Sequence, residues 1–275
     1  MAPDPLLVPL DPDHQVAFVD GGDPDGVPVL GLHGTPGCRF SRWPHDDVYA
    51  AAGVRYVTLD RAGYGWSTRR RGRSVASEAL AVLAVADHLG FERFAVAGDG
   101  AGAPHALACA ALLPDRVTRV ACRAPLAPVG AGGMQRRDWA ADLPGGDARL
   151  RWVAEGEIRV VRELQELQKR QGEVTAAADV DPQVAERFRL VVREQSLQGI
   201  AGAVDDTFAM ARPWGFNLSS ISVPVLLTHR AADDAPVAHA RWIAARVRDA
   251  DLRVDDVATD SPEHEVVETM AWLSR

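Results

Sequence analysis

The residues from Gly98 to Gly102 have the spacing of a nucleophile turn, but the central residue carries no nucleophile. An apolar run over Phe94–Ala97 leads into these glycines, and an alanine-rich segment follows them. Serine-dependent enzymes place a reactive hydroxyl at the middle of such a strand–turn–helix, between two glycines. Here the middle residue is Gly100, which relieves the backbone strain of the turn and supplies no oxygen. The pattern predicts the turn without a covalent nucleophile.

A register shifted by one residue would make Asp99 the nucleophile, since aspartate can also form covalent intermediates. The apolar run ends at Ala97, however, which puts Gly98 at the first glycine of the turn and Gly100 at its centre. Asp99 is then a polar turn residue near the mouth of the site. We keep Asp99 as the alternative catalytic residue.

Strand and helix patterns alternate around this turn, which predicts a mostly parallel, doubly wound sheet covered by helices on both faces. Helices are expected over 74–89, with Ser74 as the capping residue, and over 102–113. A last helix is expected to begin at Ser261–Pro262 and to end near Leu273. The expected strands cover residues 27–32, 54–59, 94–97, 117–122, 223–227 and 252–257.

The alternation stops in the middle of the chain. Residues 125–217 contain no convincing strand pattern, whereas 148–171 and 182–211 are charged and helical in pattern. We interpret residues 129–218 as a helical cap inserted into a core formed by residues 1–128 and 219–275.

Several segments in this order resemble the α/β-hydrolase superfamily. They are the glycine-containing loop His33–Gly37, the segment Asp60–Ser67, the turn at 98–102, and the late strand that leads to Asp233. The order of nucleophile, acid and histidine is that of the superfamily. The resemblance covers essentially the whole chain, and it is strongest to capped enzymes that act on small esters or related compounds. It implies an α/β-hydrolase fold with a helical cap.

The same resemblance implies two backbone donors for a negatively charged oxygen. They are the N–H groups of Thr35 and of Ala101, the residue after the centre of the turn. Such donors stabilise the charge that develops on a carbonyl oxygen, and neither depends on a serine side chain. An oxyanion hole is therefore expected to survive the replacement of serine by Gly100.

The remaining two members of a catalytic triad depart from the superfamily pattern. Asp233 is the better match for the acid and Asp234 the alternative, but Arg230 stands where the pattern has glycine. His264 is the candidate histidine, although Ser261–Pro262 places it in the first turn of a helix. A register anchored on Arg253 would put Thr259 or Asp260 at that position instead.

Aromatic residues of the cap are candidates for substrate binding, and packing within the cap is the alternative for each. They are Trp139, Trp152, Phe188 and Trp214. Cys38, directly after the first glycine loop, is expected to be a small buried residue rather than a reactive thiolate.

The composition of the chain limits the kinds of partner that the protein is expected to bind. The formal net charge of −8 argues against nucleic acid, and no apolar stretch has the length of a membrane span. The chain has three cysteines, Cys38, Cys109 and Cys122, and none of them has C-x-x-C spacing. An odd number of cysteines without this spacing predicts neither a disulfide framework nor a metal site, and it fits a reducing cytoplasm. The N-terminus has no signal-peptide pattern. We expect a small-molecule ligand and no cofactor, and the oligomeric state stays open.

The sequence departs from the triad pattern at three places: at Gly100, at Arg230 and around His264. Three departures favour a hydrolase fold that has diverged to another function over a hydrolase in which one residue was changed. The leading hypothesis is an enzyme that performs a cyclisation, elimination, lyase or isomerisation step on a mostly apolar substrate, using the backbone donors and a His264–Asp233 pair. One alternative is a ligand-binding protein without catalysis. Another is a small-ester hydrolase that carries an introduced Ser-to-Gly change or uses Asp99.

Overall fold

One twisted sheet organises the molecule. In the computed structural model, which describes residues 4–171, 181–255 and 262–275, eight strands pair in the order β1-β2-β4-β3-β5-β6-β7-β8. The pairs β1–β2 and β2–β4 are antiparallel, and the other pairs are parallel, which confirms the predicted mostly parallel sheet. The strands are β1 (Leu6–Asp11), β2 (His14–Gly22), β3 (Val27–Leu32), β4 (Val54–Leu59), β5 (Phe94–Asp99), β6 (Val117–Arg123), β7 (Val225–Arg230) and β8 (Ala250–Asp255).

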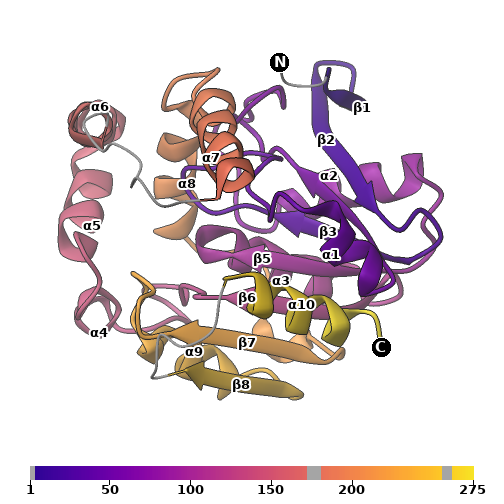
Figure 1. Ribbon diagram of the computed structural model, residues 1–275. Helices are drawn as coiled ribbons and strands as arrows, with labels where there is room; N and C mark the ends of the chain where they lie inside the picture. The colour runs from indigo at the N-terminus through magenta and orange to yellow at the C-terminus, as the bar shows by residue number, and fades with distance from the viewer. Residues whose placement is uncertain (1–3, 172–180, 256–261) are drawn as a thin grey trace.

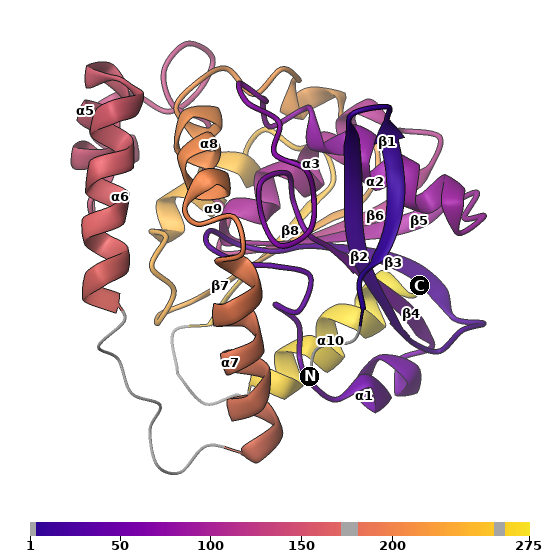
Figure 2. The same cartoon turned by 90° about the horizontal axis from the view of Figure 1, so that it is seen from above.

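Helices cover both faces of the sheet (Figures 1 and 2). On one face lie α2 (Glu78–His88), α3 (Ala103–Leu112) and α9 (Val237–Ala244), and on the other lie α1 (Asp46–Ala51) and α10 (Pro262–Leu273). Neighbouring residues along a strand point to opposite faces. Val96 therefore joins the cluster under α2 and α3, whereas Ala95 joins the cluster under α1 and α10.

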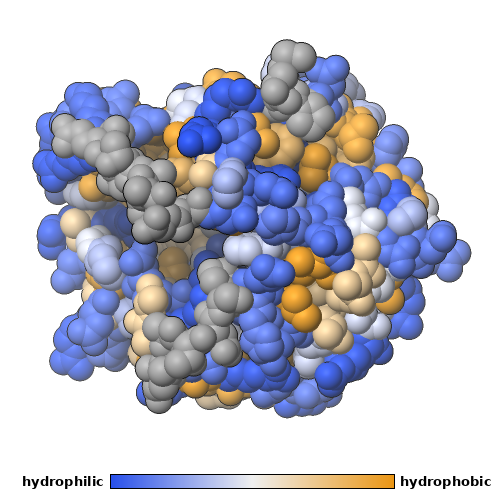
Figure 3. All heavy atoms as spheres, viewed as in Figure 1, coloured by the Kyte–Doolittle hydropathy of each residue, from blue (hydrophilic) through white to orange (hydrophobic). Residues whose placement is uncertain are grey.

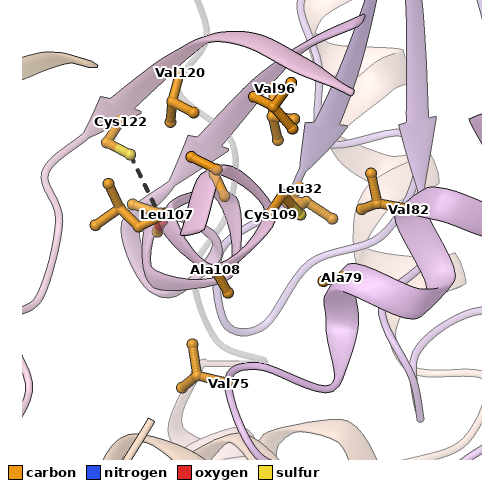
Figure 4. Packing of buried hydrophobic residues seen from close by; sticks show 14 of the residues in the cluster. Leu32, Val75, Ala79, Val82, Val96, Leu107, Ala108, Cys109, Val120 and Cys122 are labelled. Atoms are coloured by element: carbon orange, nitrogen blue, oxygen red, sulfur yellow. Dashed lines mark hydrogen bonds between the residues drawn. The ribbon is translucent and has the colours of Figure 1, made fainter. Parts of the chain in front are cut away.

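The larger core fixes the turn after β5. Leu107 and Cys109 of α3 are fully buried against the strands, and Val82 of α2 closes the layer (Figure 4). The Cys122 thiol lies 3.6 Å from the Ala103 carbonyl oxygen, which joins β6 to the first turn of α3. Burial of large aliphatic side chains stabilises such a layer by about 1.5–3 kcal/mol each, so the site stands on a rigid part of the fold.

Between β6 and β7 the described residues form five α-helices, a short 3₁₀ helix at Leu218–Ser220 and no strand. The five α-helices are α4 (Arg136–Ala140), α5 (Gly146–Glu155), α6 (Glu157–Gln171), α7 (Pro182–Gln195) and α8 (Ala201–Met210), which we call the cap helices. In Figures 1 and 2, α5 and α6 form an outer column, and α7 and α8 lie between this column and the sheet. Residues 129–218 remain our assignment of the cap.

Some boundaries differ from the sequence prediction. α2 begins at Glu78, because the amide of Ser74 donates to the Ser77 hydroxyl oxygen in a turn that precedes the helix. The pattern over 148–171 is two helices, since Gly156 breaks it at a φ of +102°. Ser261 lies outside the described residues.

Candidate active site

The chain turns sharply at the end of β5, as the glycine pattern predicts. β5 ends at Asp99, a short 3₁₀ turn spans Gly100–Gly102, and α3 follows. Gly100 has a φ of +52°, in the left-handed region that residues with a side chain rarely adopt. A Cβ atom at residue 100 would meet no heavy atom within 4 Å. The tip of the turn is therefore open and bears no side chain.

The two glycines that flank the tip have a different role. A Cβ atom on Gly98 would lie 2.6 Å from the Ala103 Cα, and one on Gly102 would lie 2.2 Å from the Leu32 carbonyl oxygen. Both distances are far shorter than van der Waals contact. Gly98 and Gly102 therefore let α3 pack closely on the ends of β5 and β3.

The loop after β3 lies against this turn and carries Thr35, one of the two expected backbone donors. A Cβ atom built on Gly34 would lie 3.4 Å from the Asp99 carbonyl oxygen, so the loop borders the end of β5. Within the described part of the chain, the N–H group of Thr35 donates to no protein acceptor, and Ala101 lies within the 3₁₀ turn. Thr35 and Ala101 stay candidate donors of an oxyanion hole.

Asp206 lies at the centre of a buried ionic cluster behind the Thr35 loop. Arg61 donates to both carboxylate oxygens of Asp206 at 2.6 and 2.7 Å, and Arg73 donates at 2.5 Å. The hydroxyl groups of Tyr64 and Thr35 also donate to Asp206. Burial alone would raise the pKa of Asp206, but Arg61 and Arg73 outweigh it and hold that pKa well below the usual range.

Arg61 connects this cluster to the donor loop. Its guanidinium donates to the His33 and Gly34 carbonyl oxygens at 2.9 and 3.0 Å, and the ring of His33 accepts the Arg61 amide. His105 is fully buried beside the cluster, and its Nδ1 is paired with the Val75 carbonyl oxygen. Burial lowers the pKa of His105, which therefore supports the fold as a neutral side chain.

An arginine joins the two candidate carboxylates. Arg123 pairs with Asp99 at 2.7 Å and with Asp233 at 2.6 Å. Asp233 also accepts the amide of Arg230 at 2.8 Å and is mostly buried, whereas Asp234 is exposed. Asp233 is thus the residue that faces the sheet, and Arg123 already binds its carboxylate.

The helix that carries His264 presents Glu265 to this cluster instead. Glu265 accepts from the Arg230 Nε at 2.9 Å and lies 3.4 Å from the Thr228 hydroxyl. Successive helical residues point about 100° apart. The His264 side chain is 54% exposed and pairs with Glu268 at 3.5 Å. Thr259 and Asp260 lie outside the described residues.

Glu265 and Arg123 are functional candidates that the sequence patterns did not single out. Burial raises the pKa of Glu265, although Arg123 and Arg230 partly oppose that shift. Arg123 is the last residue of β6, directly beside Asp99 in the strand register. Its position at the carboxyl edge of a parallel sheet, where ligands bind, is the one signal in the sequence that could have indicated it.

Some aromatic residues of the cap are buried in the hydrophobic core, and others are partly exposed at the surface. Trp139 is buried and donates to the Ala127 carbonyl oxygen at 2.7 Å, and Trp214 is buried in the same hydrophobic cluster. Trp152 is half-buried, and Phe188 is 55% exposed. Substrate binding by these side chains remains a proposal, and it applies better to Trp152 and Phe188.

The cysteines are expected to be unreactive in the folded protein. Cys38, Cys109 and Cys122 are all buried, and desolvation raises the pKa of the Cys38 thiol to about 12. Since the thiolate is the reactive form, we expect no modification by a disulfide reagent at pH 8 within minutes. Full modification of three thiols is expected after denaturation in guanidinium. Rapid labelling of native protein, abolished by Cys38→Ser, would show that the thiol is reactive.

No metal site or membrane span is found in the part of the chain that the structure describes. Over residues 4–171, 181–255 and 262–275, His, Cys, Asp and Glu form no group of three or more that could hold a metal ion. Among the same residues, no helix is both long and apolar enough to cross a bilayer. The face drawn in Figure 3 is mostly hydrophilic over the outer cap helices and is hollowed between them and the sheet.

The fold and the glycine turn define a class of protein. The α/β hydrolase fold family matches residues 27–166, half of the chain, and the protein therefore belongs to this family. Epoxide hydrolase B of Mycobacterium tuberculosis is 38% identical over 102 residues, which are 36% of this chain and 28% of that protein. Proline iminopeptidase of Neisseria meningitidis is 33% identical over 120 residues, which are 40% and 36% of the two chains. The matches thus span less than two fifths of these relatives.

Solved structures support the fold over the full length. An esterase from Exiguobacterium antarcticum superposes with a TM-score of 0.73 at 20% identity, covering 98% of this chain and 99% of the esterase. A hydrolase from Pseudomonas aeruginosa superposes with a TM-score of 0.72 at 18% identity, covering all of both chains. The α/β-hydrolase fold predicted from the sequence is confirmed.

Proposed function

We propose that this protein is a small-molecule enzyme that works without an acyl-enzyme intermediate. The observation that carries the proposal is Gly100, which has a φ of +52° and open space around its Cβ position. The backbone N–H groups of Thr35 and Ala101 are the donors that we assign to this site. The turn provides a place for substrate atoms where a hydrolase would hold its nucleophile. The reaction is a cyclisation, elimination, lyase or isomerisation step on a mostly apolar substrate held under the cap.

The backbone donors would polarise a carbonyl oxygen of the substrate. Donors of this kind, together with binding, retain a rate acceleration of about 10³–10⁴ when a triad is removed. Positioning of a flexible substrate adds to this effect in a reaction that needs no external nucleophile. The half-exposed Arg123 pairs with Asp99 and Asp233 at the same edge of the sheet and fixes the position of both carboxylates.

An acid–base pair of His264 and Asp233 is supported less well than the donors are. Asp233 pairs with Arg123, and the side chain that α10 turns toward this cluster is Glu265. We therefore favour Glu265, whose pKa burial raises, over His264 as the titrating group. Asp233 and Glu265 are both paired with arginines. This pairing equally favours the second candidate function, a ligand-binding protein without turnover.

A measurement of substrate turnover distinguishes the enzyme from the ligand-binding protein. Purified protein is incubated with extracts of small metabolites, and products are followed by mass spectrometry. The matched variant is Gly100→Asn, because asparagine tolerates the left-handed backbone and fills the open tip. A product formed by the natural chain and lost in Gly100→Asn supports the enzyme. Depletion of free ligand without any product supports the binding protein, and turnover unchanged in Gly100→Asn contradicts the proposed site.

Restoring a serine is expected to leave the protein without useful esterase activity. Gly100→Ser has room for its side chain, but Asp233 is bound to Arg123 and His264 is exposed. We expect kcat/KM for p-nitrophenyl acetate within about tenfold of the Gly100→Ala control, because a lone serine lacks its general base. An increase of about a thousandfold or more, with an acyl-enzyme burst, would instead establish an intact triad and a hydrolase that lost its nucleophile.

A further inference from the structure

A separate cavity of about 400 Å³ lies between the cap helices and the loop that follows β4. This volume lies within the usual range of small-molecule sites. The residues that matter for its chemistry are Arg71 of the loop, Val153 and Glu157 of the outer column, and Asp205, Phe208 and Arg212 at α8. Residues 33–37 and 98–102 are not part of its lining. The cavity is therefore distinct from the site proposed above, and its assignment does not depend on that function.

The charges around this cavity leave one guanidinium uncompensated. Arg69, next to the lining, donates to both oxygens of Asp205 at 2.8 and 2.9 Å. Glu157 lies 3.7 Å from both Arg69 and Arg71, which is outside hydrogen-bond range. Arg212 forms no ion pair with any residue that the structure describes. The lining itself has two arginines and two acids, and because Arg69 from outside the lining neutralises Asp205, one positive charge is left over to bind an anion.

An aromatic surface accompanies this charge. The Arg212 guanidinium lies 5.0 Å from the centre of the Phe208 ring, and Val153 of α5 contributes an aliphatic surface. Arg212 is solvent-exposed, and its contact with the half-buried Phe208 places the charge at the rim of the cavity, beside an apolar wall. A ligand with a flat apolar body and one anionic group would satisfy both features.

The α8 wall of the cavity is held in place from behind. Asp205 faces the cavity and binds Arg69, whereas the next residue, Asp206, binds the buried Arg61 and Arg73. Both aspartates are almost fully buried. Because α8 is anchored in this way, a ligand would meet a wall that needs little ordering on binding.

We propose that this cavity binds a small aromatic anion, with its acidic group on Arg212 and Arg71 and its ring against Phe208 and Val153. The probe for this proposal is 8-anilinonaphthalene-1-sulfonate, a fluorescent aromatic sulfonate. N-phenyl-1-naphthylamine has the same ring system without the charge and reports apolar binding alone. Fluorescence titrations of the full chain give the affinity for both probes.

We expect Arg212→Met to weaken binding of the sulfonate about tenfold, because a hydrogen bond to a charged group is lost. Its affinity for the neutral amine should stay within twofold. The matched control is Arg151→Met, which removes an exposed arginine of α5 that does not line the cavity. Glu157→Gln should strengthen sulfonate binding about threefold, since it removes the negative charge that competes for Arg71.

Two results would overturn the proposal. One is an unchanged affinity for the sulfonate in both Arg212→Met and Phe208→Ala, which would place the probe elsewhere. The other is an equal loss of both probes in Arg212→Met, which would show a change of packing rather than loss of a charge contact. Circular dichroism of each variant, matched to the natural chain, establishes that the comparison is between folded proteins.

Discussion

Asp206→Ala is expected to lower the free energy of unfolding by about 3–5 kcal/mol, because it leaves the buried Arg61 and Arg73 without their counter-ion. The three side chains are at most 2% exposed, so water cannot replace the lost carboxylate. For a chain of this size the loss corresponds to a fall in Tm of about 10 °C. Guanidinium unfolding followed by circular dichroism measures it.

The matched control for this change is the adjacent aspartate. Asp205→Ala removes the same group from the same helix, but its partner, Arg69, is 24% exposed. We expect a loss of only about 1 kcal/mol, because water can solvate the released guanidinium. Equal losses for the two variants would show that Asp206 contributes nothing beyond helix packing.

The contribution of Asp206 should also depend on pH in a defined direction. Its pKa is lower in the folded protein than in the unfolded chain, so its stabilisation is complete above the unfolded value of about 4. It is lost as the pH falls below that value toward the folded pKa. The difference in unfolding free energy between the natural chain and Asp206→Ala should be constant from pH 7 to 5 and shrink below pH 4. A constant difference down to pH 3 would contradict this assignment.

The Asp206 cluster also relates the cap to the donor loop. Asp206 belongs to α8, whereas Arg61 and Thr35 belong to loops of the sheet domain and bind the same carboxylate. A second buried bridge, from Glu194 of α7 through Arg39 to Asp60, fixes the neighbouring cap helix. Movement of α8 would therefore separate Asp206 from Arg61 and from the Thr35 hydroxyl. The geometry of the donors and the position of the cap are expected to change together.

Local signals in the sequence were sufficient for the turn and for most of the sheet. The turn at Gly100 depends on five consecutive residues, and the strands over 27–32 and 54–59 consist mostly of apolar residues. The antiparallel pair β1–β2 was not predicted, because it lies at a sheet edge where few side chains are buried. A weak burial pattern gives a weak periodic signal.

The ionic partners could not be read from the sequence, because they depend on distant parts of the chain meeting. Arg61 and Asp206 are 145 positions apart, and Arg123 and Asp233 are 110 positions apart. The pairing of Arg123 with both carboxylates follows from strand register and from the loop after β7, which no local pattern encodes. For the same reason no local pattern indicates Glu265, which the structure pairs with Arg230, whereas His264 stays the candidate histidine of the sequence.

The three glycines of the turn are expected to respond to alanine in very different ways. Gly102→Ala would put a Cβ atom 2.2 Å from the Leu32 carbonyl oxygen, so α3 or β3 must move. We expect a loss of about 3 kcal/mol or more in unfolding free energy, at the upper end of overpacking effects. Gly100→Ala meets no atom within 4 Å and should lose only about 1 kcal/mol, the cost of a left-handed backbone.

Chemical denaturation of the two alanine variants, with Gly98→Ala as a third, tests why each glycine is present. Gly98→Ala should resemble Gly102→Ala, because its Cβ would lie 2.6 Å from backbone. This order of stability losses would mean that close packing excludes side chains at residues 98 and 102. Residue 100, in contrast, would accept any residue that tolerates its φ. If Gly100→Ala lost as much stability as Gly102→Ala, the tip would be closed, and the space that the proposed function assigns to substrate would not exist.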